Sequence, residues 1–315
     1  MNRKAIIFGI KSTKLSNEEK KLFLKSKPWG IILFSRNIRS LEQLKSLVKS
    51  IKNLFKDKNY PIMVDQEGGK VSRLNQILDF SCFSQTYFSN LYLKNKKEFM
   101  LHYNVYINTV SSILNYVGIN INATPVMDVK YKSGHNVIGS RSFSYNTYLV
   151  KKLGSITIKL YKKNKIATVI KHIPGHGLSN VDSHKNLPVI KELKKKLMRN
   201  DFNAFKSSKS IFAMTSHGLY KSIDSKNAAT HSKILINSIV RKYIGFNGIL
   251  ISDDINMKAL QLSLKENSIR ALKAGCNLVL HCNGKINEMK KLAKYIPVID
   301  KFTKKKTSQF YKFLG

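Results

Sequence analysis

Protonatable side chains are concentrated in one short stretch, ATVIKHIPGHGLSNVDSH, which covers residues 167–184. It opens with a β-branched apolar run typical of a buried strand, which is expected to end at the Lys171–His172 pair. The proline and glycines that follow predict a loop, and this loop carries His176, Asp182 and His184. Loops held by a rigid scaffold often carry catalytic groups, whereas the alternative is a histidine-rich surface loop with a capping aspartate.

Asp182 and His184 are separated by one residue. In an extended loop, side chains at positions i and i+2 share a face, so the carboxylate can hold and polarise the imidazole. A histidine paired in this way can act as a general acid–base near neutral pH.

Zinc binding is the rival use of the histidines in this stretch. Histidines four residues apart, such as His172 and His176, chelate zinc well on a helix. Pro174 and Gly175 lie between them and exclude a helix, and the three cysteines form no ligand cluster. We therefore expect no metal site.

Charged side chains elsewhere follow the same strand-end pattern. The chain has only 18 acidic residues, and six of them lie at or just beyond predicted strand ends: Asp65, Glu67, Asp128, Asp182, Asp253 and Asp254. Basic and imidazole groups gather at the same ends, namely Arg73, Arg141, Lys171, His172, His184 and His217. In a barrel of parallel strands these ends share one rim, where barrel enzymes place their chemistry. Such a rim, without a glycine-rich phosphate loop, suits a neutral polyhydroxylated substrate.

Cleavage of a glycosidic bond requires an acid for the leaving oxygen and a base or nucleophile near the anomeric carbon. Asp253 follows a buried strand and is the nucleophile candidate. Its neighbour Asp254 is expected to point the other way and to make structural hydrogen bonds. Asp65 and Arg73 can clamp the sugar, or can form a structural ion pair across their loop.

Eight apolar runs alternate with helical patterns along the chain. The expected strands cover residues 5–10, 30–34, 61–64, 119–123, 167–170, 210–214, 248–251 and 277–280. A helix is expected to begin at Ser16, which forms a capping box with Glu19, and another at 40–54, capped by Ser40 with Gln43. Further helices are expected at 83–117, 148–163, 193–205, 230–243 and 257–273, and twice near the C-terminus. This order predicts a single (β/α)8 TIM barrel over residues 1–315 as one catalytic domain, because no linker composition interrupts it.

The formal net charge of +38 raises the question of nucleic acid. Only 8 of the 56 basic residues are arginine, and the lysine runs at 194–196 and 304–306 have no interleaved aromatic residues. We expect no specific nucleic-acid partner, although weak attraction to polyanions follows from the charge. The N-terminal apolar run is too short for a signal peptide, and no segment is long enough to span a membrane. A cytoplasmic monomer with reduced thiols is the expectation.

Several motifs together carry a family resemblance. KHIPGHG followed by four residues and DSH, with VDQEGGKVSRL, VIGSRSF, SDDINMKAL, ILFSRNI and AGCNLVLHCN, resembles family 3 glycoside hydrolases. Within that family the match is to single-domain bacterial β-N-acetylglucosaminidases of cell-wall recycling. The resemblance implies a retaining hydrolase of terminal, non-reducing β-linked N-acetylglucosamine. The implied substrate is a GlcNAc–1,6-anhydro-MurNAc fragment, with or without its peptide.

The same resemblance implies residue roles. Asp253 would form the covalent glycosyl-enzyme, and His184, partnered by Asp182, would be the acid–base on a mobile loop. The positions that match those holding the sugar are Asp65, Arg73, Arg141, Lys171 and His172. No metal or organic cofactor is implied. Asp253 must stay ionised, and we expect nearby arginine and lysine to keep its pKa low.

Two positions depart from the family pattern, and two other functions stay open. Lys70 stands where arginine is common, and Asn277 where aspartate is common. Lysine lacks the planar fork of arginine, so a contact behind the site would be weaker. A phosphorylase could use the same residues, because a neutral histidine repels phosphate less than a carboxylate does. A non-catalytic barrel that binds sugar or polyanions is the third reading.

Overall fold

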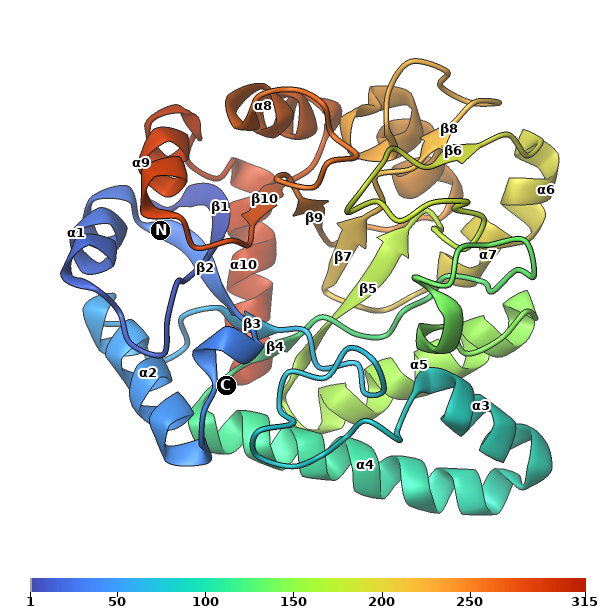
Figure 1. Ribbon diagram of the computed structural model, residues 1–315, viewed down its shortest axis with the longest axis horizontal. Coiled ribbons are helices and arrows are strands. Elements are labelled where there is room, and N and C mark those ends of the chain that lie inside the picture. Colours follow the sequence, from blue (N-terminus) through green and yellow to red (C-terminus); the bar gives the residue numbers. More distant parts are fainter. Residues whose placement is uncertain (1) are drawn as a thin grey trace.

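A closed barrel of eight parallel strands forms the centre of the molecule (Figure 1). The computed structural model describes residues 2–315. Around the barrel the strand order is β1 (Lys4–Gly9), β10 (Leu278–His281), β9 (Ile249–Asp254), β7 (Phe212–Thr215), β5 (Ala167–Ile173), β4 (Ile121–Asn122), β3 (Ile62–Val64) and β2 (Pro28–Leu33). The predicted (β/α)8 barrel is confirmed.

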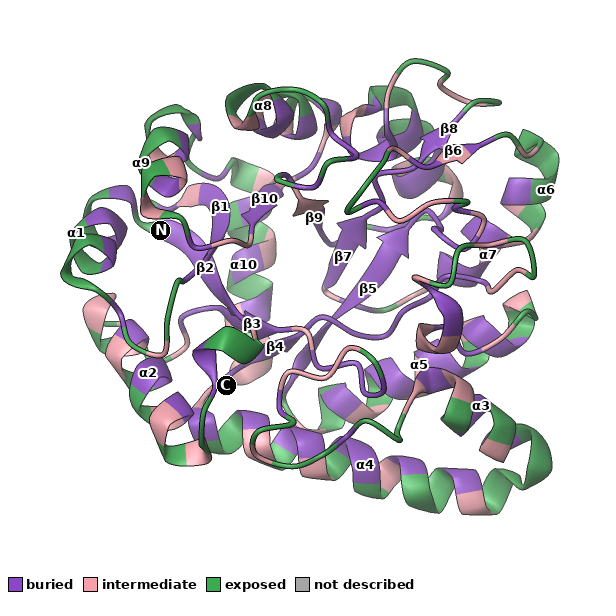
Figure 2. Ribbon diagram, viewed as in Figure 1, coloured by how far each residue is buried: buried purple, intermediate pink, exposed green. Residues whose placement is uncertain are grey.

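Helices surround the barrel and bury their apolar faces against it (Figure 2). The predicted caps are present at the first two helices. Ser16 and Glu19 cap α1 (Asn17–Ser26) reciprocally, and the Ser40 side chain caps α2 (Leu41–Leu54). The other predicted helices seen as single elements are α5 (Thr147–Lys163), α9 (Ile286–Tyr295) and α10 (Lys301–Leu314). No helix in residues 2–315 is long and apolar enough to cross a membrane.

Two expected helices are divided. The segment 83–117 forms α3 (Gln85–Lys94) and α4 (Lys96–Val117), because Asn95 ends the first and its side chain caps the second. The segment 193–205 forms α6 (Lys194–Arg199) and α7 (Asp201–Phe205), which separate at Asn200. Apolar spacing continues across both breaks, so the hydrophobic pattern alone did not locate them.

Two further helix predictions were wrong in their bounds or type. The segment 230–243 forms a short 3₁₀ turn, η3 (Ala229–His231), followed by η4 (Leu235–Tyr243), which has π-helical hydrogen bonding. Helix α8 (Leu264–Ala274) begins seven residues after the predicted start at Met257. Ser263 and Glu266 form its capping box, and the preceding residues are turns that border the barrel mouth.

The opposite end of the barrel is closed by α10. Phe310 of this helix packs against Trp29 of β2 and Phe212 of β7, and the Trp29 indole N–H donates to the hydroxyl of Thr307 (2.9 Å). Both rings and the indole are fully buried. The charged residues lie at the other end of the barrel, at the mouth where the strands end.

A short parallel pair that the sequence did not predict lies beside this mouth. Strand β6 (Val189–Ile190) pairs with β8 (Leu219–Tyr220), and so joins the loop after β5 to the segment after β7. Strand β5 also continues to Ile173 rather than ending at the Lys171–His172 pair. Both features fix the root of the loop that carries Asp182 and His184.

Candidate active site

A pocket of about 170 Å³ lies at the carboxyl ends of the strands. Seven of the eight predicted site residues line it: Asp65, Arg73, Arg141, Lys171, His172, His184 and Asp253. The eighth, Asp182, is not among the lining residues but contacts the His184 side chain. Segments nearly 190 residues apart in the chain (Asp65 to Asp253) therefore meet at one place, as the strand-end pattern predicted.

One wall of the pocket is a cluster of five charged side chains. Lys171 Nζ lies 2.6 Å from Asp65 Oδ1 and 2.6 Å from Glu67 Oε1. Arg141 donates to both oxygens of Glu67 at 2.8 Å, from Nε and Nη2. The expected Asp65–Arg73 pair is present but longer, at 3.9 Å, so Lys171 is the nearer partner of Asp65.

In this wall neighbouring opposite charges offset the effect of burial on the pKa of Glu67 and of Lys171. Burial raises the pKa of the Glu67 carboxyl, but Arg141 and Lys171 outweigh burial and hold it far below its usual range. Burial lowers the pKa of Lys171, but Asp65 and Glu67 raise it above its ordinary value. Glu67 and Lys171 are thus ionised near neutral pH and present a fixed acceptor and a fixed donor.

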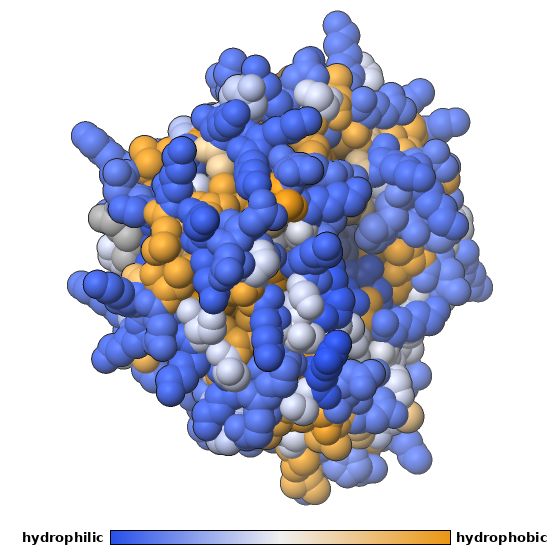
Figure 3. Space-filling view, turned by 60° about the vertical axis from the view of Figure 1, so that its left-hand side comes forward, coloured by the Kyte–Doolittle hydropathy of each residue, from blue (hydrophilic) through white to orange (hydrophobic). Residues whose placement is uncertain are grey.

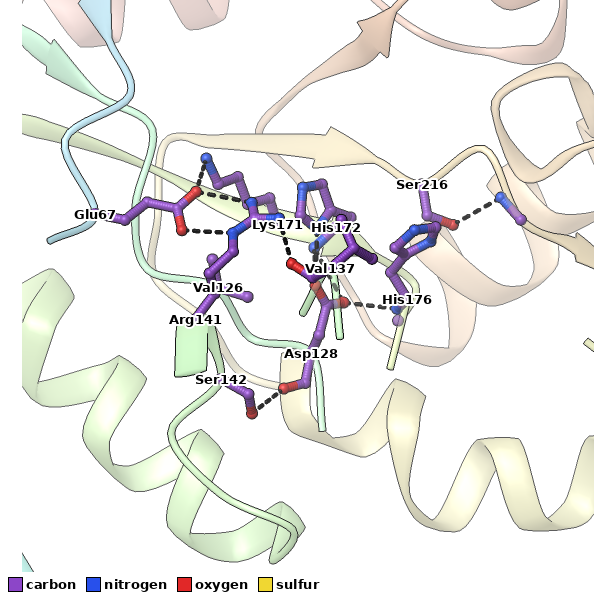
Figure 4. A network of polar contacts seen from close by, with 12 residues as sticks. Glu67, Val126, Asp128, Val137, Arg141, Ser142, Lys171, His172, His176 and Ser216 are labelled. Carbon is purple, nitrogen blue, oxygen red and sulfur yellow. Dashed lines mark hydrogen bonds and ion pairs between the residues drawn. The ribbon is translucent and has the colours of Figure 1, made fainter. Parts of the chain in front are cut away.

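A second buried carboxylate, Asp128, organises the two histidines of the KHIPGH segment (Figure 4). Its Oδ2 lies 2.7 Å from His172 Nδ1, and its Oδ1 accepts the backbone N–H of His176 at 2.6 Å. Burial raises the pKa of Asp128, but His172 and His176 more than offset this, so the pKa is lowered. Burial also lowers the pKa of His176, to about 4, so this ring is neutral.

Asp253 lies at the end of β9 and faces the pocket. Its backbone N–H donates to Thr215 Oγ1 (3.3 Å), and its Oδ1 accepts from the N–H of Asp254 (2.8 Å). Burial raises the pKa of Asp253, but His217 and His172 lower it by a larger amount. The expectation that arginine and lysine do this was wrong, because the nearby cations are taken up by Asp65 and Glu67.

Asp254 makes the structural hydrogen bonds that were predicted for it, although this residue also lines the pocket. Its Oδ1 accepts the backbone N–H groups of Asn256 and Cys282, both at 3.2 Å. Burial raises the pKa of Asp254, in contrast to its neighbour. Of the two adjacent carboxyls, Asp253 is therefore the one whose pKa is lowered.

The Asp182–His184 pair has the geometry that its spacing predicted. His184 Nδ1 lies 2.9 Å from Asp182 Oδ1, which also accepts the His184 backbone N–H at 2.9 Å. Burial raises the pKa of Asp182, but the hydrogen bonds from His184 lower it further than burial raises it. The His184 side chain is 69% exposed, and the loop touches the segment after β9 through Ser183 and Ala259.

The chain is similar to proteins of one known family. Residues 4–306 match the family described as Glycosyl hydrolase family 3 N terminal domain. The chain belongs to glycosyl hydrolase family 3. It is 31% identical over 299 residues to a beta-hexosaminidase of Idiomarina loihiensis, covering 94% of this chain and 88% of that protein. A beta-hexosaminidase of Neisseria meningitidis is 33% identical over 288 residues, covering 89% and 78%.

Solved structures give the same result. NagZ from Neisseria gonorrhoeae in complex with N-trifluoroacetyl-D-glucosamine has a TM-score of 0.84 and 28% identity, covering 100% of this chain and 90% of that one. This family 3 member is therefore a glycoside hydrolase of the β-N-acetylhexosaminidase type.

The two departures from the family pattern lie away from the chemistry. Lys70 is exposed and lines no part of the pocket. Asn277 precedes β10, at the end of the strand opposite the mouth, where its Oδ1 accepts from Leu250 N–H and Arg241 Nη2, both at 2.8 Å. The Asn277 amide thus stands where the family commonly has an aspartate carboxylate, and its oxygen has hydrogen-bond donors.

Sequence reasoning named Glu67, Asp128 and His217 as rim residues but gave them no role at the site. In the structure Glu67 contacts Arg141 and Lys171, and Asp128 contacts His172, all three of which were predicted to bind the sugar. The His217 ring is hydrogen-bonded to the Thr230 hydroxyl and to the backbone carbonyl of Asp254. His176, considered for zinc, is buried without a hydrogen-bond partner for either ring nitrogen. In residues 2–315 no group of three or more His, Cys, Asp and Glu side chains is arranged to hold a metal ion.

Asp201 packs against the loop after β5 and makes the stability of the folded protein depend on pH. Asp201 accepts a hydrogen bond from the Tyr131 hydroxyl (2.9 Å) and packs against Gly175. A Cβ atom added at Gly175 would lie 2.8 Å from the Cβ of Asp201. Burial raises the pKa of Asp201 to about 7. The folded protein then binds more protons at this site than the unfolded chain between about pH 4 and pH 7, so the free energy of unfolding falls as pH rises.

Asp201→Asn is expected to remove this dependence. Relative to the natural protein, the variant should gain stability from pH 5 to pH 8, by about 1.4 kcal/mol for each unit of pKa shift. Denaturant unfolding of both proteins at several pH values measures the difference. A difference that stays constant with pH would show that Asp201 does not titrate in this range.

Proposed function

We propose that this family 3 enzyme releases terminal, non-reducing β-linked N-acetylglucosamine with retention, through a covalent intermediate on Asp253. The observation that carries the proposal is that the ionised Asp253 lines the same pocket as His184, which is held by Asp182. The opposite wall of that pocket bears the charged side chains suited to sugar hydroxyls. An acid–base on one loop and a nucleophile on a strand are the two groups that retention requires.

In the first half-reaction the Asp253 carboxylate attacks the anomeric carbon and the glycosidic bond breaks. Because Asp182 accepts from His184 Nδ1, the proton that reaches the leaving oxygen comes from Nε2 of the imidazolium. In the second half-reaction the neutral His184 takes a proton from water as the water oxygen bonds to the anomeric carbon. Asp253 leaves as a carboxylate, and the product keeps the β configuration. Asp182 stabilises the imidazolium form throughout.

The sugar ring is held by Asp65, Arg73, Arg141, Lys171 and His172. Arg73 is the most exposed of the cations, at 29%, and its guanidinium also lies over the ring of Phe34. Binding of N-trifluoroacetyl-D-glucosamine by the NagZ of N. gonorrhoeae supports an N-acylated glucosamine as the sugar. No organic cofactor or metal takes part in these steps.

The proposed physiological substrate is the GlcNAc–1,6-anhydro-MurNAc fragment of peptidoglycan, with or without peptide, and the setting is cell-wall recycling. The beta-hexosaminidase relatives support the release of a hexosamine. The fragment and the setting are those that the family resemblance implies. We further propose that the chain works in the cytoplasm as a monomer with one catalytic domain, without a nucleic-acid or membrane partner. On the face shown in Figure 3 hydrophilic side chains predominate, and apolar patches lie between them.

Trapping of the intermediate tests the mechanism. A 5-fluoro derivative of an activated N-acetylglucosaminide should form a stable adduct, and mass spectrometry of the digested protein should place it on the peptide that contains Asp253. Asp254→Asn is the matched control, and it should still be labelled. An adduct on another peptide would contradict the assignment, and binding without any turnover would favour the non-catalytic reading.

Phosphorolysis on the same residues is separated by product identification. The natural protein is incubated with substrate in the presence and absence of inorganic phosphate. We expect free N-acetylglucosamine in both cases at equal rates. Accumulation of N-acetylglucosamine 1-phosphate would instead assign a phosphorylase.

A further inference from the structure

Asp128 is a completely buried carboxylate that touches the pocket only through other residues. It follows β4 and lies 44 residues before His172 in the chain. Three donors converge on it: the His172 Nδ1 at 2.7 Å, the His172 backbone N–H at 3.2 Å and the His176 backbone N–H at 2.6 Å (Figure 4). No other side-chain donor in residues 2–315 bonds to its carboxylate.

The contact at Nδ1 determines what His172 presents to the pocket. A carboxylate with a lowered pKa can only accept, so Nδ1 carries a hydrogen. In the neutral ring Nε2 then has a free lone pair, and it has no hydrogen-bond partner within the described chain. His172 lines the pocket with its side chain only 10% exposed, so Nε2 is held in one orientation.

We propose that Asp128 is a positioning residue: it fixes the tautomer and orientation of His172, so that Nε2 accepts a hydrogen bond from a hydroxyl of the bound sugar. This inference rests on the proposed function, in which His172 binds the sugar. The site thus holds two aspartate–histidine pairs of opposite kind. The His184 ring is 69% exposed and exchanges its proton, whereas the His172 ring is enclosed and serves as a fixed acceptor.

Asp128→Asn tests the tautomer with almost no change of shape. The asparagine Oδ1 can keep both backbone N–H donors, because these converge on one oxygen. Its Nδ2 then faces His172 Nδ1 and donates to it, which forces the hydrogen onto Nε2. The ring would then offer the sugar a donor in place of an acceptor. The same replacement in the catalytic triad of serine proteases keeps the geometry but fixes the wrong histidine tautomer.

The first readout is kinetic. Asp128→Asn should raise KM for the N-acetylglucosaminide about 10- to 100-fold, by analogy with the loss of activity when the hydrogen-bond partner of a metal-binding histidine is removed. The effect on kcat should be smaller, because the groups at the reacting bond are untouched. In a His172→Ala background the same change should have little further effect, because Asp128 acts through His172.

The second readout is spectroscopic. Protein labelled with ¹⁵N-histidine should show the His172 signals of the Nδ1–H tautomer, assigned by their loss in His172→Ala, and Asp128→Asn should convert them to the Nε2–H pattern. Asp201→Asn is the matched control, because Asp201 is a buried carboxylate under the same loop that does not contact His172. It should leave the tautomer unchanged, and its effect on KM should add to that of His172→Ala.

The possible results separate the two proposals. An unchanged tautomer in folded Asp128→Asn, or a KM effect that is fully retained in the His172→Ala background, would overturn the role of Asp128. If His172→Ala itself leaves KM unchanged while trapping still labels Asp253, the sugar-binding role of His172 fails and this inference fails with it. Loss of labelling at Asp253 in the natural protein would instead contradict the proposed mechanism.

Discussion

Asp253→Ala is expected to lower kcat by about 10⁴-fold or more, while the protein still binds N-acetylglucosamine. The magnitude follows from removal of the group that forms the covalent bond, since the remaining groups supply only a small residual acceleration. The variant should stay folded, because the Asp253 side chain accepts only one hydrogen bond, from its neighbour's N–H, in the described structure. Steady-state rates and binding calorimetry measure the two quantities.

Azide provides the decisive control for this variant. In Asp253→Ala the small nucleophile can occupy the space of the lost carboxylate and attack the same face of an activated glycoside. The expected product is the α-glycosyl azide, because the attack now occurs only once. A β-glycosyl azide, or residual activity within tenfold of the natural enzyme, would show that another residue is the nucleophile.

The architecture could be predicted because most barrel strands contain a short apolar run. Strands such as β2 and β9 are buried along nearly their whole length, so their composition alone marks them. Helix boundaries were harder where polar contacts decide them. Asn95 divides one apolar pattern into two helices by capping, and α8 begins only at its Ser263–Glu266 box. Hydrophobic spacing carries no information about such contacts.

The site was predictable in its local part and not in its long-range part. The Asp182–His184 pair depends on two residues in one loop, so its spacing was enough. The roles of Glu67 and Asp128 depend on distances across the barrel mouth, to Arg141 and to His172. For the same reason the low pKa of Asp253 was attributed to the wrong groups: only the folded arrangement shows that carboxylates neutralise the cations while histidines face the nucleophile.

His184→Ala is expected to reduce kcat/KM by about 10²- to 10⁴-fold for a substrate with a sugar leaving group. The loss should be less than about tenfold for a dinitrophenyl glycoside, whose leaving group departs without a proton. The ratio kcat/KM is the informative quantity because it reports only steps up to cleavage of the glycosidic bond. Equal losses on both substrates would contradict the role of His184 as the acid.

The same variant separates the two tasks of one imidazole. For the activated glycoside the second half-reaction still needs a base, so kcat should fall even where kcat/KM does not, and the glycosyl-enzyme should accumulate. Azide needs no base and should restore kcat, here with a β-glycosyl azide because Asp253 is intact and the reaction proceeds through two displacements. Asp182→Asn keeps the His184 ring but removes the carboxylate that holds it, so this variant should lose less rate than His184→Ala. If His184→Ala lowers neither kcat for the activated glycoside nor kcat/KM for the substrate with a sugar leaving group, both proton transfers belong to a different residue.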